Sequence, residues 1–157
     1  GRSLIPAALG IRANGDGMAY GIDPWKTEAS LEGETVADNK GWWGGLDHHA
    51  IHRGCVEKIW ELGLDEWCTL IRATSQSCAD LFPSIDILHI DGNHSEIVSQ
   101  RDVKLYLPRV KPGGYVWFDD IEWPSTEIAQ RMVAEKCVAQ GDIIGEGGTI
   151  CRIYKKS

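Results

Sequence analysis

The sequence contains no run of apolar residues long enough to cross a membrane, and it carries no excess of basic residues. Its formal net charge is −7, with 16 Lys and Arg against 23 Asp and Glu. Nucleic acids and anionic membrane surfaces attract basic proteins, so this charge argues against both as partners. A signal-peptide pattern is also lacking, and we expect a cytoplasmic protein.

Cysteine pairs of the C-x-x-C type are absent, and the number of cysteines is odd. This pattern is typical of free thiols in a reducing compartment rather than of a disulfide framework. The local patterns place Cys55, Cys78 and Cys137 in helices, and Cys68 and Cys151 in or beside strands.

The sequence alternates between segments with helical spacing of apolar residues and short strand-like runs. Helical spacing covers residues 3–15, 48–64, 96–110 and 125–141, and strand-like runs cover residues 18–25, 68–75, 84–92 and 115–120. The helix over 96–110 is expected to end through Pro112 and the glycine pair at 113–114. Residues 142–156 predict a hairpin around the turn GEGG. The near-continuous apolar run in 84–92 predicts a strand covered on both faces.

This alternation predicts an α/β fold, a doubly wound and mostly parallel sheet with a C-terminal antiparallel hairpin. The length suits a single domain over residues 1–157. Residues 26–47 show no clear period, and a polar segment of that length is typical of a lid or binding loop.

Ligands of such sheets bind beyond the carboxyl ends of the strands, so polar residues at strand ends are the candidates for the site. Asp23 lies about 20 residues after the start of the first helix, the spacing at which a carboxylate binds nucleoside ribose hydroxyls. The alternative is an Asp that caps its own turn before Pro24. Trp25 could stack on a purine or pack beneath the loop.

Three carboxylates, Asp91, Asp119 and Asp120, follow two neighbouring strands. Such charges repel one another unless a cation joins them, and carboxylate oxygens suit Mg²⁺. The alternative is that one of them caps the next helix while the pair stays solvated. His94 could accept a proton from a substrate hydroxyl, or could be an ordinary loop histidine.

A second donor group, His48, His49, His52 and Cys55, could face one side of a helix. Zinc can use this spacing, but no second ligand cluster accompanies it. A solvated helix start with a buried cysteine is the favoured interpretation.

The runs GRSLIPAAL, YGIDPW, IDILHIDGNHS and RDVKLYLPRVKPGGYVWFDDIEW together resemble class I methyltransferases of the methyltransferase-24-like family. These are relatives of the macrocin-type and cephalosporin-hydroxylase-type O-methyltransferases. The resemblance implies a Rossmann-like sheet and methyl transfer from S-adenosylmethionine. It implies that Asp23 holds the ribose, that Ser75 lies by the adenine, and that the acids of metal-using relatives, here Asp91, Asp119 and Asp120, hold Mg²⁺.

In that family an opening strand and a glycine-rich loop end in Gly-Arg-Ser, which here are the first three residues. The resemblance therefore implies a domain that is incomplete at its N-terminus, with Gly1, Ser3 and Asp91 near the cofactor. The family's opening strand lies between the strand ending at Asp23 and the strand ending at Asp91. We expect these two strands to pair directly, to receive a strand from another chain in a homodimer, or to stay apart.

The function that these features favour is an O-methyltransferase for a small hydroxylated molecule, such as a sugar, with Mg²⁺ assistance and with Asp91 and His94 as catalytic residues. One alternative is a non-catalytic module that binds a nucleoside or assembles with other chains. Another is a nicotinamide-dependent oxidoreductase, against which the terminal hairpin and the double aspartate argue.

Overall fold

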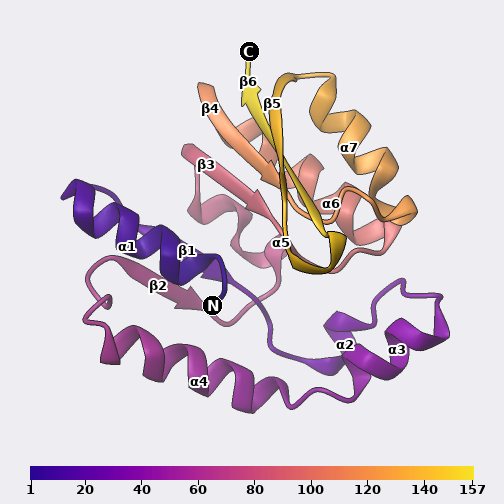
Figure 1. Ribbon diagram of the computed structural model, residues 1–157, viewed down its shortest axis with the longest axis horizontal. Coiled ribbons are helices and arrows are strands. Elements are labelled where there is room, and N and C mark those ends of the chain that lie inside the picture. The colour runs from indigo at the N-terminus through magenta and orange to yellow at the C-terminus, as the bar shows by residue number, and fades with distance from the viewer.

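The structure is a computed structural model that describes residues 1–157, apart from the side chain of Glu146. The chain forms two halves, each with its own sheet (Figure 1). We call residues 1–74 the first half and residues 85–157 the second half. The first half contains α1 (Leu4–Asn14), β1 (Ala19–Ile22), α2 (Thr27–Ser30), α3 (Ala37–Gly44), α4 (His48–Glu61) and β2 (Cys68–Ile71). The connection contains α5 (Ser75–Cys78) and the 3-10 turn η1 (Ala79–Leu81). The second half contains β3 (Ile85–Ile90), α6 (Glu96–Tyr106), η2 (Leu107–Arg109), β4 (Val110–Phe118), η3 (Pro124–Thr126), α7 (Glu127–Ala134), β5 (Cys137–Ile144), η4 (Glu146–Gly148) and β6 (Ile150–Lys156).

The ends of the helices follow from local chemistry. Helix α1 stops at Gly15, which takes a left-handed φ of 79° and donates its N–H to the last carbonyls of the helix. Helix α4 starts at Asp47, whose carboxylate accepts a hydrogen bond from the backbone N–H of Ala50. No described helix is long and apolar enough to span a bilayer.

The described strands form two sheets. Strands β1 and β2 form a parallel pair, and the second sheet has the order β3-β4-β6-β5. In that sheet β3 and β4 are parallel, while β6 runs antiparallel to both β4 and β5. The expected C-terminal hairpin is thus confirmed. Among the described residues no strand joins β1 to β3, so the direct pairing of these two strands, one of the three expected arrangements, is not seen. A strand received from another chain stays a prediction.

Each half has its own apolar core. The larger core lies in the second half, between its sheet and helices α6 and α7, and contains Ile90, Val103, Leu107, Val110, Val116, Phe118, Ala129, Val133, Cys137 and Tyr154. The smaller core lies between α1, α4 and the β1–β2 pair, and contains Ala8, Cys55, Ile59, Leu64 and Cys68. All five cysteines are free thiols, as expected.

The expected end of the third helix was wrong. Helix α6 ends at Tyr106, and β4 already begins at Val110. The KPGG run is instead an irregularity inside β4, because Ile85 pairs with Val110 while Ile87 pairs with Tyr115. Gly114 is required there, since a Cβ at this position would lie 2.8 Å from the carbonyl oxygen of Asp86.

Two further expectations need correction. Helix α7 ends at Ala134, and Cys137, expected in this helix, begins β5. Strand β3 is not covered on both faces, because Ile87 is 55% exposed. Among the described residues β3 is an edge strand, paired only with β4.

The segment over residues 26–47 is not a plain loop, because it contains α2 and α3. Its α2 end is tied to the second half by Asn93, whose side-chain amide nitrogen donates to the carbonyl oxygens of Ala29, Ser30 and Glu32, each at 3.0 Å. The Glu32 carboxylate also pairs with both terminal nitrogens of Arg101, at 2.7 and 2.8 Å. We call the contact of Asn93 with these three carbonyls the Asn93 clasp.

Candidate functional site

Three carboxylates meet where β3 and β4 end. Asp91 follows β3, and Asp119 and Asp120 follow β4. The backbone N–H of Asp119 donates to the carbonyl of Ile90 at 3.0 Å, which keeps the two strand ends together. Asp120 adopts a left-handed φ of 50°, which Asp tolerates better than most residues. Ligand atoms of Asp91 lie within 4.8 Å of those of Asp119 and of Asp120, but no donor grouping among the described residues contains all three acids, so a site made of these three carboxylates stays a prediction.

Two histidines lie among these acids. Donor atoms of Asp91, His94 and Asp120 all lie within 4.8 Å of one another, and the same holds for His89, Asp91 and Asp119. The Nε2 atom of His94 is 3.3 Å from an Asp120 carboxylate oxygen, and that of His89 is 4.0 Å from an Asp119 oxygen. The sequence analysis named His94 but missed His89. The spacing could have indicated His89, since it stands two positions before Asp91 and so shares a strand face with it.

The crowding of acids shifts their proton affinities. Burial, and then the neighbouring Asp119 carboxylate, raise the pKa of Asp91 to about 6. The pKa of Asp120 is also raised, chiefly by burial, with His94 acting in the opposite direction. Burial lowers the pKa of His89, so its imidazole is favoured in the neutral form. A site of this kind gains from a bound positive charge.

A cavity of about 440 Å³ opens beside these acids. Its lining comes from the start of the chain, from the two strand ends and from the β5–β6 hairpin: Arg2, Ser3, Asp91, Asp119, Ile143, Gly145, Thr149 and Cys151. Ser3 and Asp91, two of the residues expected near a cofactor, therefore line the same cavity. Gly1 comes directly before Arg2, a lining residue of this cavity. A Cβ at Gly1 would lie 3.1 Å from the sulfur of Cys55.

Asp23 stands exposed at the end of β1, where its Oδ1 accepts a hydrogen bond from the backbone N–H of Trp25 at 2.5 Å. The turn-capping alternative thus describes what one of its oxygens does, and a role on the ribose stays a prediction. Trp25 is buried, and its ring lies edge-on to His52 with centroids 4.5 Å apart. Stacking of Trp25 on a purine also stays a prediction.

Ser75 is engaged within the protein. Its hydroxyl donates to a carboxylate oxygen of Asp102 at 2.5 Å, and its carbonyl accepts a hydrogen bond from the Tyr106 hydroxyl. These contacts fix the start of α5 against α6. A contact of Ser75 with adenine remains a prediction from the resemblance.

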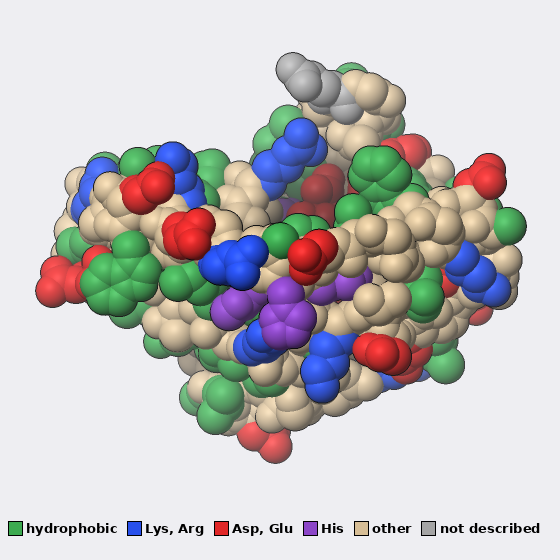
Figure 2. All heavy atoms as spheres, turned by 90° about the horizontal axis from the view of Figure 1, so that it is seen from below, with side chains coloured by type: hydrophobic (Ala, Val, Ile, Leu, Met, Phe, Trp, Pro, Cys, Tyr) green, Lys and Arg blue, Asp and Glu red, His purple; other side chains and the backbone are tan. Residues whose placement is uncertain are grey.

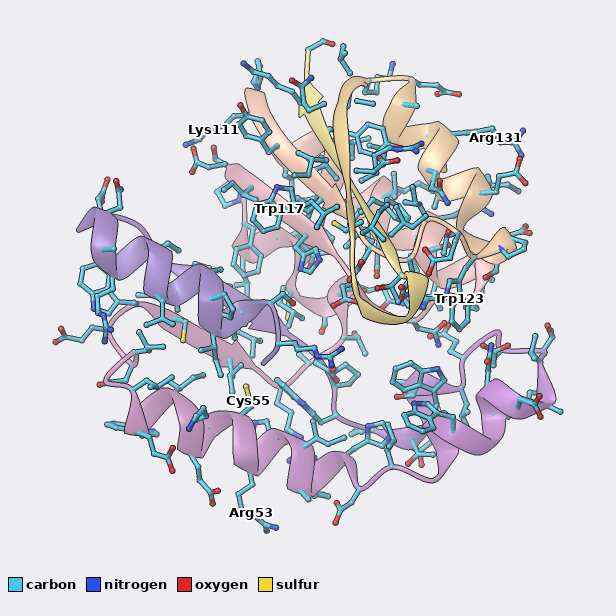
Figure 3. All side chains as sticks on the ribbon, viewed as in Figure 1. Arg53, Cys55, Lys111, Trp117, Trp123 and Arg131 are labelled. Carbon is cyan, nitrogen blue, oxygen red and sulfur yellow. The ribbon has the colours of Figure 1, made fainter. Side chains whose placement is uncertain are left out.

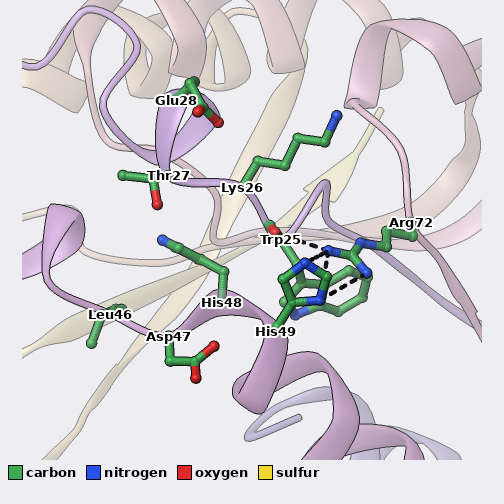
Figure 4. A pocket seen from close by; sticks show the side chains of 9 residues that line it. All are labelled: Trp25, Lys26, Thr27, Glu28, Leu46, Asp47, His48, His49 and Arg72. Atoms are coloured by element: carbon green, nitrogen blue, oxygen red, sulfur yellow. Dashed lines mark hydrogen bonds between the residues drawn. The ribbon is translucent and has the colours of Figure 1, made fainter.

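A second cavity of about 310 Å³ lies at the start of α4 (Figure 4). It is lined by Trp25, Lys26, Thr27, Glu28, Leu46, Asp47, His48, His49 and Arg72. The Arg72 guanidinium lies 3.4 Å from the His49 ring nitrogens and donates to the Trp25 carbonyl. Histidine side chains gather on this face of the molecule (Figure 2). Neither donor grouping found among the described residues includes a residue of α4.

A family model described as a methyltransferase domain matches residues 1–121 of the chain. The protein belongs to this methyltransferase family. The matched range includes every candidate residue named above from Gly1 to Asp120. No curated protein matched the sequence in a direct comparison.

Solved structures similar to this chain have the class I methyltransferase fold. The O-methyltransferase NovP matches with a TM-score of 0.60 at 16% identity, over 94% of this chain and 64% of NovP. The O-methyltransferase TomG of Streptomyces achromogenes, solved in complex with SAM, matches with a TM-score of 0.59 at 12% identity, over 97% of this chain and 78% of TomG. TrmN of Thermus thermophilus matches with a TM-score of 0.55 at 17% identity, over 96% of this chain and 48% of TrmN. The chain thus spans about half of TrmN and less than two thirds of NovP.

Proposed function

We propose that this protein transfers a methyl group from S-adenosylmethionine to a hydroxyl of a small molecule, such as a sugar, with help from a divalent cation. The observation that carries the proposal is the cavity in which Asp91 and Asp119 meet Ser3 at the start of the chain, on the fold of a methyltransferase family. The site lies at the carboxyl edge of the sheet, where ligands of such folds bind.

Asp91, Asp119 and Asp120 would hold Mg²⁺, which would lower the pKa of a hydroxyl bound beside it. The residues present fit this role, because carboxylate ligand atoms crowd one edge of the sheet, and burial, followed by the neighbouring Asp119 carboxylate, raises the pKa of Asp91. In the proposal His94, beside Asp120, accepts the hydroxyl proton. S-adenosylmethionine would supply the methyl group, which would pass to this oxygen with loss of the carbon–sulfur bond and release of S-adenosylhomocysteine.

The cofactor supplies a methyl group that is already activated on a sulfonium, so the protein contributes mainly positioning. Asp23 is the proposed ribose ligand, because its carboxylate is exposed at the end of β1 and can accept two hydroxyl hydrogen bonds. Gly1 and Ser3 are proposed near the amino-acid end of the cofactor. The acceptor is proposed to be a small molecule, and neither nucleic acid nor a membrane is part of this proposal.

The cofactor proposal is tested by calorimetry with S-adenosylmethionine and S-adenosylhomocysteine. Asp23→Ala should weaken binding by about 1–3 kcal/mol, since a charged hydrogen-bond acceptor is lost. Asp16→Ala is the matched control, because Asp16 is also an exposed Asp of the first half, and it should leave binding unchanged. Absence of binding to either nucleoside, or tighter binding of a nicotinamide cofactor, would refute the proposal.

Transfer itself is tested with methyl-labelled cofactor and a panel of hydroxylated small molecules that includes sugars. We expect label in the acceptor and a loss of transfer with a chelator. Cofactor binding without transfer to any acceptor would favour the non-catalytic alternative.

A further inference from the structure

The arrangement of donor atoms at the acidic site differs from the all-carboxylate set that the sequence led us to expect. Among the described residues, each of the two groupings of three donors contains a histidine, and both share Asp91. Asp91, Asp119 and Asp120 do not form such a grouping by themselves. In each grouping two carboxylates are therefore joined by an imidazole nitrogen.

His94 is the stronger of the two histidine candidates. Its side chain is only 10% exposed, and its Nε2 is buried without a hydrogen-bond partner in the structure. The Nε2 of His94 lies 3.3 Å from an Asp120 carboxylate oxygen, but the two atoms are not oriented for a hydrogen bond. Buried polar atoms without a partner are rare and call for an explanation, such as an ion. His89 is more exposed, at 26%, and lies further from its carboxylate.

The ring of His94 is held in place by a neighbouring aromatic side chain. It packs edge-on against Trp123, with ring centroids 5.0 Å apart. Trp123 is labelled in Figure 3. Its chain neighbour Asn93 is fixed by the Asn93 clasp and accepts a hydrogen bond from the backbone N–H of Ser95. The nitrogen is thus positioned by its surroundings rather than by a bond that it makes itself.

We propose that Asp91, His94 and Asp120 bind one divalent first-row transition-metal ion, such as Mn²⁺, through two carboxylates and the Nε2 of His94. The proposal rests on the proposed function for the location of the site and changes the class of ion. Mg²⁺ prefers an all-oxygen octahedral shell and keeps its waters, whereas imidazole suits transition ions. Ligand atoms within 4.8 Å of one another are compatible with a single ion at normal bond lengths.

This assignment gives His94 a different task from the one in the proposed function. A nitrogen that coordinates an ion cannot at the same time accept a proton. His94 would then orient the ion, and Asp119, which lines the cavity and lies outside this donor set, would be the carboxylate left to accept the hydroxyl proton.

The proposal is tested by titrating the metal-free protein with Mn²⁺ in the absence of any nucleoside, following the signal of free Mn²⁺ by electron paramagnetic resonance. We expect Mn²⁺ to bind at least about tenfold more tightly than competing Mg²⁺. His94→Ala should lower Mn²⁺ affinity by about 10–100-fold and should change Mg²⁺ affinity far less. His89→Ala is the matched control and should retain the preference for Mn²⁺.

Equal affinities for the two ions, or a loss of Mn²⁺ binding in His89→Ala but not in His94→Ala, would overturn the proposal. In the second case His94 would keep its role as proton acceptor. Because His94→Ala could also disturb the fold, pulsed resonance on the Mn²⁺-loaded unmutated protein supplies a second measurement. A nitrogen coupling typical of a coordinated imidazole, retained in His89→Ala, is expected, and its absence refutes the assignment.

These measurements do not depend on methyl transfer. Failure to bind S-adenosylmethionine would refute the proposed function and leave a transition-metal site intact. Preference for Mg²⁺ would refute the metal assignment and leave methyl transfer intact.

Discussion

The first half of the chain supports a two-stranded sheet, whereas the second half builds a four-stranded one. The core of the second half includes Val116, Phe118, Ala129 and Val133, each no more than 1% exposed. The first half has a smaller core, in which Ala8 and Leu64 are the only fully covered members. A pair of strands is marginal on its own, so the first half depends more on contacts outside its own sheet.

The two sheets are alike in one respect, because each has an open strand edge. Among the described residues β1 has only β2 as a strand neighbour, and β3 has only β4. Tyr20 on β1 is 51% exposed and Ile87 on β3 is 55% exposed. Open edges of this kind can receive a strand from another chain, so a homodimer remains a prediction.

The comparison predicts that truncating a core side chain in the first half destabilises only that half. Phe118→Ala should lower the free energy of unfolding by about 3–5 kcal/mol, because it leaves a large cavity in the main core. Leu64→Ala should cost about 2–5 kcal/mol, and its effect should be confined to the first half. Chemical denaturation gives the total cost, and native-state hydrogen exchange gives its location.

In Leu64→Ala, faster exchange is expected in α4 and β2, with α6 and β4 unchanged. Trp60→Ala is the control near Leu64, in the last turn of α4, because Trp60 is 64% exposed and should change stability little. Equal loss of protection in both halves of Leu64→Ala would show that the two cores unfold as one unit.

The Asn93 clasp provides a smaller and more local test. Asn93→Asp keeps an oxygen for the Ser95 N–H but replaces the donor to three carbonyls with a repelling carboxylate. We expect a loss of about 0.5–1.5 kcal/mol, since three carbonyls that are at most partly buried lose their hydrogen-bond donor. Hydrogen exchange should speed up over residues 27–44 and stay unchanged in β4 and β6.

Asn14→Asp is the matched control for the clasp, because Asn14 is exposed and makes only a long contact of 3.5 Å. It should leave exchange over residues 27–44 unchanged. If Asn93→Asp behaves in the same way, the α2–α3 segment is held by other contacts, of which the Glu32–Arg101 pair is the strongest candidate.

The smallest expected effect concerns pH, measured with a chelator present. The pKa of Asp91 is raised to about 6 in the folded protein, from an ordinary value of 3.8. Between these values the folded state binds more protons than the unfolded state, so this group favours folding increasingly as pH falls from about 7 to about 4. Solvent in the cavity screens the charges and limits the effect to roughly 1 kcal/mol.

At pH 7.5 the Asp91 carboxylate is charged in the folded protein, and this charge opposes folding. Asp91→Asn removes the charge, so the variant should be more stable than the unmutated protein at this pH. Its advantage should shrink as the pH approaches 4. An advantage that is independent of pH would contradict the raised pKa of Asp91.

The sequence was a good guide wherever a strand ends in a polar residue. Asp23, Asp91, Asp119 and Asp120 stand at the expected strand ends, because apolar runs broken by acids are legible without tertiary structure. His89 was missed because a histidine inside an apolar run looks like part of the strand. The Asn93 clasp could not be foreseen, since its partners are backbone carbonyls that carry no side-chain signal.

The misplaced element ends have physical causes as well. The residues around Cys137 continue the spacing of α7, but antiparallel pairing with β6 places them in β5. The KPGG run carries typical helix-stop residues, yet it forms the irregularity of β4 where Gly114 approaches the Asp86 carbonyl. In both cases pairing between strands overrode a local preference.

The Asn93 clasp also has a consequence for biosynthesis. The carbonyls of Ala29, Ser30 and Glu32 precede Asn93 by 61 to 64 positions in the chain. At ordinary rates of synthesis this separation corresponds to roughly 3–13 s between the emergence of the α2 end and of the side chain that holds it. During that interval the first half leaves the ribosome with an open strand edge and with α2 untied, so it is the part of the nascent chain that most needs protection from aggregation.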